Sequence, residues 1–493
     1  MNIAQRFIDS AARYPDRTFV ATASGRSTPD ALSYGEAMRK ASVLAAQLRT
    51  RGVVVGDRVL LLCPNSLDFV CAYFAIWMAG GTIIPLDPRS RPDHVNRIVD
   101  DCSAKCVVVP ATVHALEATA QQVVLADVDW SSPAEMTGVD PTGNSLALII
   151  YTSGTTGTPR GVCLSHENLE HSRASITSWA KVSDLDRELL TLPLTHLFGL
   201  AHLHVYCALG ATVYLEDGFR DIPRLLDMIE RFGITSFPCT PGGLKIILDR
   251  FGDLFALKAR RLRYVVINTS PMPVALTRKL LSTLPDTEIF MYYGLTEASR
   301  STYIPYRNHL DKLETVGKAT PGSEVCIGQA GLPVIGVPGE ILVRGSHVTS
   351  GYWRQPSGEF FDDGWFRTGD LGIIDEQGFL TWIGRLREQI NVNGLKLVPA
   401  EVEEVLRSDS RVADCAVVGV PDAATGESVV AYVVLEESAA QVRSERELRR
   451  LCSLHLDDHK VPRRILFIEE LPKTVSGKVK RHLLLERWIN GER

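Results

Sequence analysis

The chain has 493 residues, of which 45% are hydrophobic and 23% are charged, and its formal net charge at pH 7 is −5. This composition is typical of a globular protein with a large core and more than one domain. The slightly acidic balance and the lack of a long basic block argue against a nucleic-acid-binding surface, so no nucleic-acid partner is expected.

The cysteines and the N-terminal segment bear on the cellular compartment. Ten cysteines are scattered without a Cys-x-x-Cys pair, which argues against a zinc knuckle and a redox motif. The first residues carry charges where a secretory signal would be hydrophobic, and no apolar stretch approaches the length of a membrane span. We therefore expect reduced thiols, a cytoplasmic location and no membrane partner.

Short apolar strands alternate with amphipathic helices through most of the chain. Residues 59–62 and 82–86 have the pattern of buried strands, and residues 67–78 between them have helical periodicity. The fold class is therefore α/β, with a large N-terminal domain of layered sheets and helices on both faces. Further strands of this kind are expected at 106–109, 212–215 and 264–267, and a further helix at 222–229.

From Gly317 the pattern changes to short strands separated by glycines, which predicts a small β subdomain. Its strands are expected at 340–344, 365–366, 373–374 and 379–383, with a hairpin turn at 375–378. A compact α+β domain follows, with helices at 400–406 and 445–454 and strands at 412–420, 429–435 and 464–468. The predicted domains are residues 1–384 and 385–493.

The most informative segment is residues 151–161, Tyr-Thr-Ser-Gly-Thr-Thr-Gly-Thr-Pro-Arg-Gly, which follows an apolar strand at 146–150. Glycines let backbone N–H groups approach an anion closely, and each Thr or Ser adds a hydroxyl donor. The segment therefore predicts a phosphate-binding loop, although the spacing of the usual P-loop, G-x-x-x-x-G-K-[ST], is absent. The alternative is a flexible surface loop.

Five more segments complete a pattern. They are residues 192–200 (Leu-Pro-Leu-Thr-His-Leu-Phe-Gly-Leu), 292–297 (Tyr-Tyr-Gly-Leu-Thr-Glu), 364–370 (Gly-Trp-Phe-Arg-Thr-Gly-Asp), 384–394 (Gly-Arg-Leu-Arg-Glu-Gln-Ile-Asn-Val-Asn-Gly) and 471–478 (Leu-Pro-Lys-Thr-Val-Ser-Gly-Lys). In order and spacing, the six segments resemble the adenylate-forming superfamily, which includes acyl- and aryl-CoA synthetases, peptide-synthetase adenylation domains and firefly luciferase. The resemblance covers nearly the whole chain.

The resemblance implies an AMP-forming acid–thiol ligase. A small-molecule carboxylic acid would attack the α-phosphate of ATP, release pyrophosphate and form an acyl-AMP, and CoA would then accept the acyl group. Two anions meet in the first step, so the site must neutralise charge and hold an in-line geometry. The implied cofactors are ATP and Mg²⁺, with CoA or phosphopantetheine as acceptor.

The resemblance also assigns residues to the nucleotide. Tyr293 would stack on adenine, beside Tyr292 and Gly294 of the same motif, and Thr296 would reach the α-phosphate. Glu297 would hold Mg²⁺ through a hard oxygen. The β- and γ-phosphates would be wrapped by Thr152, Ser153, Gly154, Thr155, Thr156 and Gly157, with Arg160 where the family usually has Lys.

The same resemblance extends to the ribose and to the loop that meets adenine. Asp370 would accept hydrogen bonds from the ribose hydroxyls, and Arg385 would add positive charge near the ribose and phosphate. Residues 268–273, Asn-Thr-Ser-Pro-Met-Pro, depart from the family, because Thr269 and Ser270 stand where glycine or alanine is usual. Ser270 is nevertheless expected to contact adenine. Taken singly, any of these residues could instead belong to a turn or a helix cap.

Lys478 resembles the mobile catalytic lysine of the family, which bridges the incoming carboxylate and the α-phosphate. Arg387 occupies the hinge position about which the small C-terminal domain would rotate after adenylation. The rotation would remove the lysine and bring Gly394 toward the acyl-adenylate, where a missing side chain leaves room for the thiol arm. As an alternative to a hinge in this segment, Glu388 would form a pair with a neighbouring residue on the surface.

The acid pocket is expected around His196, Phe198 and Phe237, with His196 as a gate at the carboxylate. No Asp follows the histidine segment where amino-acid-activating domains place one, which indicates an acid without a recognised α-amino group. His196, His202 and His204 do not have a zinc-binding spacing. The residues expected to be catalytic are Lys478, Thr296, His196 and Arg385.

Three alternatives to a CoA ligase remain. The chain could load its acyl group onto the pantetheine of an acyl carrier protein. It could be a nucleotide-binding switch without a thioester product, although the missing P-loop spacing and Lys478 argue against that class. It could also be a luciferase-like oxygenase that shares the adenylation step.

Overall fold

The computed structural model describes residues 3–22, 29–110, 120–132, 145–152, 160–270, 272–328, 334–355, 361–422, 425–436, 444–473 and 478–491. The chain divides into two compact units. The first contains residues 1–325 and 343–366, and the second contains residues 326–342 and 367–493. The predicted boundary at 384/385 stays a prediction.

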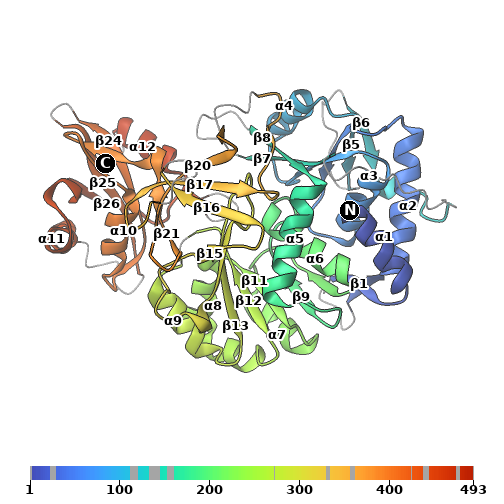
Figure 1. Ribbon diagram of the computed structural model, residues 1–493, viewed down its shortest axis with the longest axis horizontal. Coiled ribbons are helices and arrows are strands. Elements are labelled where there is room, and N and C mark those ends of the chain that lie inside the picture. The colour runs from blue at the N-terminus through green and yellow to red at the C-terminus, as the bar shows by residue number, and fades with distance from the viewer. Residues whose placement is uncertain are drawn as a thin grey trace. The chain divides into compact units, whose positions relative to one another are not determined.

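A nine-stranded sheet forms one half of the first unit (Figure 1). Its middle six strands are parallel, and β2, β14 and β15 are antiparallel additions at its edges. Their order is β15 (Lys318–Ala319), β14 (Thr302–Pro305), β13 (Glu288–Tyr293), β12 (Tyr264–Ile267), β11 (Ser236–Cys239), β9 (Arg187–Leu190), β10 (Thr212–Leu215), β1 (Thr18–Thr22) and β2 (Asp30–Ser33).

A seven-stranded sheet forms the other half of this unit. Its parallel strands carry almost only apolar residues, as expected for strands covered on both faces. The antiparallel strand β8 returns directly from β7, so the two strands form a hairpin. The order is β18 (Gly351–Tyr352), β8 (Arg160–Ser165), β7 (Leu146–Thr152), β4 (Thr82–Leu86), β3 (Arg58–Leu62), β5 (Cys106–Val109) and β6 (Gln121–Val124).

Helices cover both sheets and fill the space between them. α3 (Leu67–Met78) is hydrophobic on every side and buried over nearly its whole length, which suits a helix enclosed by other elements. Residues from both sheets join this helix in one hydrophobic core. The other helices of this core are α1 (Ile3–Arg13), α2 (Tyr34–Thr50), α5 (His166–Ala180) and α6 (Leu197–Leu209). The remaining helices of the first unit are α4 (Pro92–Cys102), α7 (Ile222–Arg231), α8 (Pro241–Lys258) and α9 (Val274–Thr283), with short 3₁₀ turns η1 (Leu125–Asp127) and η2 (Tyr306–Asn308).

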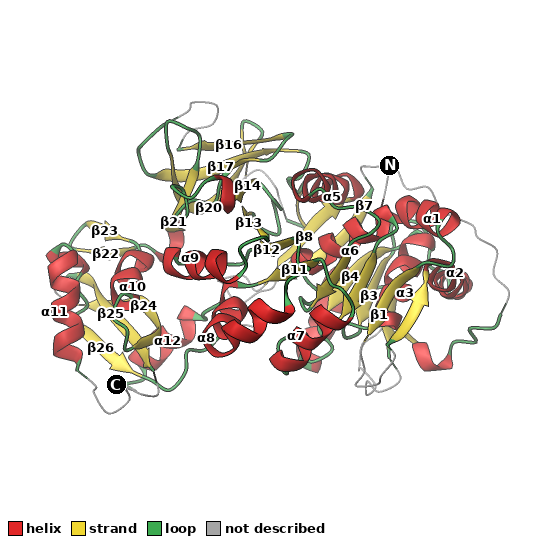
Figure 2. Ribbon diagram, turned by 90° about the horizontal axis from the view of Figure 1, so that it is seen from below, coloured by secondary structure: helices red, strands yellow, loops and turns green. Residues whose placement is uncertain are grey.

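The two faces of the nine-stranded sheet carry different helices. Figure 2 shows α5 and α6 on one side of β11–β13 and α7 and α8 on the other. The pairing of β11 with β12 places Ser236 opposite Tyr264 and Phe237 opposite Val265. Because successive side chains of a strand point to opposite faces, Ser236 and Tyr264 face α6, whereas Phe237 faces α8.

The glycine-punctuated region forms a five-stranded sheet, as expected. One prediction is wrong: residues 365–366 and 373–374 are not two strands but the ends of a single strand, β20 (Trp365–Ile374). A register shift between Leu371 and Gly372 lets this strand continue through its glycines. The sheet contains β16 (Ser323–Ile327), β17 (Gly339–Gly345), β20, β19 (Phe361–Asp362) and β21 (Leu380–Arg385).

The C-terminal part of the second unit has its own sheet and its own core. The hydrophobic side chains of α10 and α11 pack on one face of this sheet, and those of α12 pack on the other. Its strands are β22 (Ile390–Val392), β23 (Leu395–Leu397), β24 (Val412–Asp422), β25 (Gly426–Leu435) and β26 (Arg464–Phe467). Its helices are α10 (Pro399–Arg407), α11 (Glu445–His455) and α12 (Arg481–Ile489), with 3₁₀ turns η4 (Leu386–Glu388) and η6 (Asp458–Lys460).

The predicted fold class is confirmed: layered α/β sheets form a large N-terminal part, and a smaller α+β part follows. The helix predicted at 67–78 and the strands predicted at 82–86, 106–109, 212–215 and 264–267 have the expected bounds. Within the parts of the chain that the structure describes, no helix has both the length and the apolar character that crossing a membrane requires.

Three buried histidines make the fold sensitive to mild acid. Burial lowers the pKa of His166 to about 4 and those of His204 and His347 to about 3. An unfolded histidine titrates near pH 6.5. Between these values the unfolded chain binds more protons, so this stability is complete above pH 6.5 and is lost as the pH falls toward 3.

We expect the free energy of unfolding in urea to decrease by about 1 kcal/mol per histidine between pH 7.5 and pH 5.5, a range in which carboxylates hardly titrate. The variant His347→Gln should lose about one third of this decrease. The control His455→Gln, at an exposed position, should keep all of it. An unfolding midpoint that does not change between the two pH values would contradict the expectation.

Candidate active site

The predicted phosphate loop is carried by the β7–β8 hairpin. Thr152 ends β7 and Arg160 begins β8, and the two residues are paired across the hairpin. The Oγ1 atom of Thr152 donates to the backbone oxygen of Arg160 at 3.5 Å. Ser153, Gly154, Thr155, Thr156 and Gly157 lie outside the described residues, so their role stays a prediction. The hairpin therefore holds the two ends of the loop next to each other, at the same end of β7 and β8.

The motif at residues 292–297 begins in β13 and continues into a tight turn. The turn folds back so closely that a Cβ atom on Gly294 would lie 2.4 Å from the backbone nitrogen of Arg300. Glycine is therefore required at this position by packing alone. Tyr293 is buried, whereas Thr296 and Glu297 are half-buried. Two residues that the resemblance assigns to the α-phosphate and to Mg²⁺ thus lie side by side in one turn.

Tyr352 contacts two residues of the predicted site, and the sequence did not reveal it. Its hydroxyl donates to Oε1 of Glu297 at 2.8 Å, and the Arg160 guanidinium lies 5.7 Å from the centre of its ring. Tyr352 is in β18, which pairs with β8. A hydrogen bond of this kind orients a carboxylate, so Tyr352 holds Glu297 near Arg160, the first residue after the phosphate loop.

The carboxylate of Glu297 is compatible with Mg²⁺. This ion usually takes one or two protein carboxylates and completes its shell with phosphate oxygens and water. In the described part of the chain, no group of three or more His, Cys, Asp or Glu side chains is arranged to hold a metal ion. A metal bound through Glu297 would therefore depend on oxygens that the nucleotide brings.

The loop after β12 has an unusual backbone conformation. Thr269 has a φ of +96°, a conformation that a β-branched residue rarely adopts. The backbone N–H of Thr269 donates to the side-chain oxygen of Asn268, which holds this conformation. Ser270 is exposed, and its contact with adenine stays a prediction.

The residues predicted for the acid pocket do not form a single wall. His196 is exposed and precedes α6, and Phe198 on that helix contacts Tyr292 at 5.5 Å between ring centres. Phe237 lies on the opposite face of the sheet, where its ring meets Phe219 and Phe255. The structure thus brings Phe198 together with the 292–297 motif, and the part of Phe237 in binding the acid stays a prediction.

The other two histidines of this region have partners of their own. Nδ1 of His202 lies 2.9 Å from the carboxylate of Glu188, and Nε2 of His204 lies 2.8 Å from the hydroxyl of Tyr73. All four side chains are fully buried. Their partners lie on β9 and α3, so the two histidines face different sides of α6, and each has a buried polar contact of its own.

Asp370 and Arg385 are brought together in the second unit. They are opposite residues of β20 and β21, and Nε of Arg385 lies 3.0 Å from Oδ1 of Asp370. The carboxylate is almost completely buried, whereas 41% of the Arg385 side chain is exposed. Their roles at the ribose and the phosphate stay predictions.

The glycine predicted to face the thiol arm also has a purely local role. Asn393 and Gly394 form the two-residue turn between β22 and β23, and both have positive φ values of 54° and 84°. A turn of this type favours Asn-Gly for its backbone alone. Arg387 is exposed within η4, and its role as a hinge stays a prediction.

Lys478 is exposed and directly follows residues 474–477, which lie outside the described part of the chain. An antiparallel bridge joins Lys473 to Val479, so the segments before and after these residues run side by side. The Nζ atom of Lys473 also forms an ion pair with Asp414 at 2.7 Å. The segment that carries Lys478 is therefore anchored at its base.

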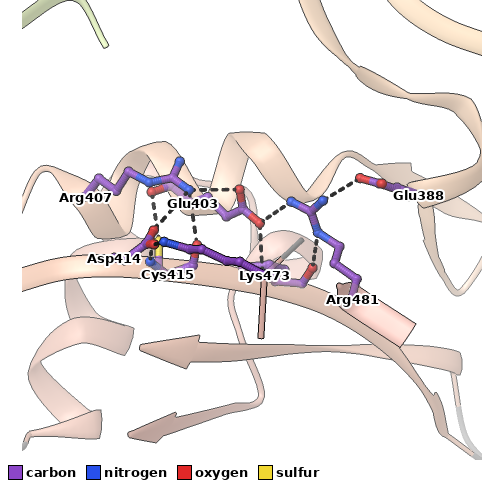
Figure 3. Close-up of polar contacts among 8 residues, drawn as sticks. Glu388, Glu403, Arg407, Asp414, Cys415, Lys473 and Arg481 are labelled. Atoms are coloured by element: carbon purple, nitrogen blue, oxygen red, sulfur yellow. Dashed lines mark hydrogen bonds and ion pairs between the residues drawn. The ribbon is translucent and has the colours of Figure 1, made fainter. Parts of the chain in front are cut away.

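An ion-pair network continues this anchor on the C-terminal side (Figure 3). Arg481 binds Glu388 at 2.8 Å with one nitrogen and the buried Glu403 at 2.7 Å with another. Glu403 also accepts hydrogen bonds from Arg407 and from the backbone N–H of Val417. Burial opposes the charge of Arg481, but the two glutamates outweigh it and raise the pKa of this guanidinium. The expectation that Glu388 pairs with a neighbour is confirmed.

Two family models account for most of the sequence. The model described as AMP-binding enzyme matches residues 7–353, and the model described as AMP-binding enzyme C-terminal domain matches residues 401–478. The chain belongs to the AMP-binding enzyme family. It is thereby a member of the adenylate-forming superfamily, which confirms the resemblance and the expectation of an enzyme.

Curated relatives and solved structures of this family match along nearly the full length. The long-chain-fatty-acid–CoA ligase FadD13 of Mycobacterium tuberculosis is 31% identical, and the match covers 94% of this chain and 94% of FadD13. The 2-succinylbenzoate–CoA ligase of Listeria monocytogenes is 30% identical, with coverage of 90% and 92%.

Among solved structures, ATP-bound MatB from Rhodopseudomonas palustris superposes with a TM-score of 0.89 at 27% identity. The match covers 100% of this chain and 100% of MatB. MenE from Bacillus subtilis, with its acyl-adenylate intermediate OSB-AMP, has a TM-score of 0.88 at 26% identity, with coverage of 97% of each chain. The AMP-binding enzyme fold thus extends over both parts of this chain.

Proposed function

We propose that this AMP-binding enzyme is an AMP-forming acid–CoA ligase. It activates a small-molecule carboxylic acid with ATP as an acyl-adenylate, releases pyrophosphate, and transfers the acyl group to the thiol of CoA. The observation that carries the proposal is the match to both family models together with the complete set of six motifs, from the phosphate loop to Lys478. The curated relatives that match along nearly the full length are themselves named as CoA ligases.

Each part of the nucleotide is assigned to particular residues of the chain. The loop that starts at Thr152 and ends at Arg160 binds the β- and γ-phosphates, and the turn containing Thr296 receives the α-phosphate. Asp370 binds the ribose hydroxyls. Glu297 would hold Mg²⁺, which would supply positive charge for the leaving pyrophosphate. Lys478 supplies the positive charge that the attack of a carboxylate on the α-phosphate requires.

The identity of the acid is not fixed by the relatives. Their names refer to long-chain fatty acids, 2-succinylbenzoate, oxalate and 4-coumarate, all at 28–31% identity. The acceptor is assigned to CoA from the same names. Loading of a carrier-protein pantetheine is the alternative, and it uses the same first half-reaction.

The test is a product analysis with ATP, Mg²⁺ and a panel of carboxylic acids. Release of AMP and pyrophosphate would support the proposal, whereas ADP and phosphate would indicate a nucleotide switch. Addition of CoA, or of a carrier protein bearing its pantetheine arm, then identifies the acceptor from the thioester formed. Adenylation without transfer to either thiol would contradict the second half of the proposal.

The magnesium role of Glu297 gives a separate expectation. Glu297→Gln should raise the Mg²⁺ concentration needed for half-maximal pyrophosphate release by at least about tenfold, because a charged ligand is lost. Tyr352→Phe removes the hydrogen bond that orients this carboxylate and should cause a smaller shift in the same direction. A Mg²⁺ requirement that stays unchanged in Glu297→Gln would remove this residue from the metal site.

A further inference from the structure

Arg300 is a buried cation that forms no ion pair within the described residues. Its side chain is completely inaccessible to solvent, and within the described residues its Nε and Nη2 atoms have no hydrogen-bond partner. The remaining nitrogen, Nη1, donates to Oγ of Ser299 at 2.5 Å. A charged side chain is almost never fully buried unless it is paired, and an unpaired buried charge costs several kcal/mol. Stability of the fold alone therefore does not explain this residue.

The backbone of the 292–297 motif sets the position of Arg300. The turn that contains Thr296 and Glu297 closes with the backbone nitrogen of Arg300 against Gly294. Arg300 has a φ of +65°, which is unfavourable for a residue with a side chain, and its carbonyl oxygen accepts a hydrogen bond from Thr320 at 2.8 Å. The strained backbone at Arg300 thus places its side chain beside the nucleotide motif.

The Arg300 guanidinium lies beside Phe198, which is predicted to line the acid pocket. Its central carbon lies 4.7 Å from the centre of the Tyr292 ring, and Tyr292 in turn contacts Phe198 of α6. The positive charge is therefore next to aromatic side chains of the predicted pocket.

Glu188 is the buried carboxylate that acts electrostatically on Arg300. Its Oε2 atom accepts from Ser236 at 2.7 Å and lies 2.9 Å from His202, whereas its Oε1 atom has no partner within the described residues, and no ion pair there joins it to Arg300. Its field still acts at longer range: burial lowers the pKa of Arg300, and Tyr292 and Glu188 oppose that shift. A guanidinium does not release its proton in a protein, so the positive charge remains.

Building on the proposed function, we propose that Arg300 selects acids of the dicarboxylic class and binds the carboxylate that is not activated. The planar guanidinium presents a fork of N–H donors that matches a carboxylate in geometry as well as in charge. A dicarboxylic acid brings a carboxylate that can accept from Nε and Nη2, which no group within the described residues does. Its other carboxylate is then left for the α-phosphate at the turn of residues 294–300.

The test compares matched pairs of acids in the wild-type enzyme. Each pair contains a monocarboxylic and a dicarboxylic acid of equal chain length, for example butanoate with succinate and hexanoate with adipate. We expect at least one dicarboxylic acid to exceed its partner in kcat/KM for pyrophosphate release by at least about 10²-fold, since sites built around a buried polar group reject analogues that leave it unpaired.

Variants then assign the selectivity to Arg300. Arg300→Met, which has a similar length and no charge, should lose activity with the dicarboxylic acid by at least about 10²-fold and keep activity with the monocarboxylic partner. Arg300→Lys should recover part of the loss, because the charge returns without the fork. Arg91→Met, at an exposed arginine, is the control and should behave as wild type.

A further measurement does not depend on the folding of any variant. Acyl-sulfamoyl adenosine analogues with and without a terminal carboxylate are compared as inhibitors of the wild-type enzyme, and the carboxylate is expected to tighten inhibition by at least about 10²-fold. Equal inhibition, or equal use of both acids of every pair, would overturn the role of Arg300 and leave the ligase assignment intact. If no acid of either class releases AMP and pyrophosphate, the proposed function fails, and this inference fails with it.

Discussion

Replacing Lys478 with alanine is expected to slow acyl-adenylate formation by at least about 10²-fold, the scale of losing one charge partner of a transition state. Transfer of the acyl group from supplied acyl-adenylate to the thiol should stay close to the wild-type rate. The physical reason is that two anions meet only in the first half-reaction. The measurement is pyrophosphate release for the first step and thioester formation from synthetic acyl-adenylate for the second.

A neighbouring lysine provides the control for this experiment. Lys480→Ala removes the same charge two residues further along and should affect neither half-reaction strongly. An equal loss of both half-reactions in Lys478→Ala would contradict a lysine that acts in adenylation alone. An equal effect of Lys480→Ala would show that the general positive charge of the segment, rather than Lys478 itself, is responsible.

The second large effect concerns the stability of the second unit. Arg481→Met should lower the free energy of unfolding there by about 3 kcal/mol, because it breaks a buried pair and leaves Glu403 with only its longer contact to Arg407. The Glu403 side chain is only 5% exposed. Hydrogen exchange of the amides in α10 and β24, followed in the full-length protein, measures this loss directly.

Two further variants separate the buried charge from general packing. Arg407→Met removes a longer and more exposed contact with the same carboxylate, at 3.2 Å, and should have a smaller effect. The double variant Arg481→Met with Glu403→Met removes both charges and should recover most of the stability. A double variant that is no more stable than Arg481→Met would show that the network contributes through packing instead.

The fold could be predicted well from the sequence where apolar runs are short and clearly bounded. Residues 67–78 form the helix that the periodicity indicated, and residues 82–86 form the strand after the glycines that end it. The prediction failed for β20, because Gly369 and Gly372 interrupt the apolar pattern. Pairing with β21 across a register shift carries the strand through them, and pairing of that kind is not visible in a local pattern.

The candidate site shows a similar limit. Its motifs are contiguous in sequence, so residues 292–297, Asp370 and Arg385 could be named from the sequence, but the ion pair between Asp370 and Arg385 could not. Tyr352 could not be found, because it reaches Glu297 across 55 residues of sequence. Arg300 was overlooked since its unusual property, burial without an ion pair among the described residues, exists only in three dimensions. The sequence likewise suggested Phe198 and Phe237 as one wall, whereas strand register places them on opposite faces of the sheet.

The two-residue strand β18 has a consequence for how this region can vary among related enzymes. It pairs with β8 directly after the phosphate loop, and its Tyr352 hydroxyl holds Glu297. An insertion or deletion just before Gly351 would shift this strand along its partner and would disturb the nucleotide loop and the carboxylate together. Changes in loop length are therefore tolerated less here than the small size of the strand suggests, and natural variation in length should gather elsewhere on the surface.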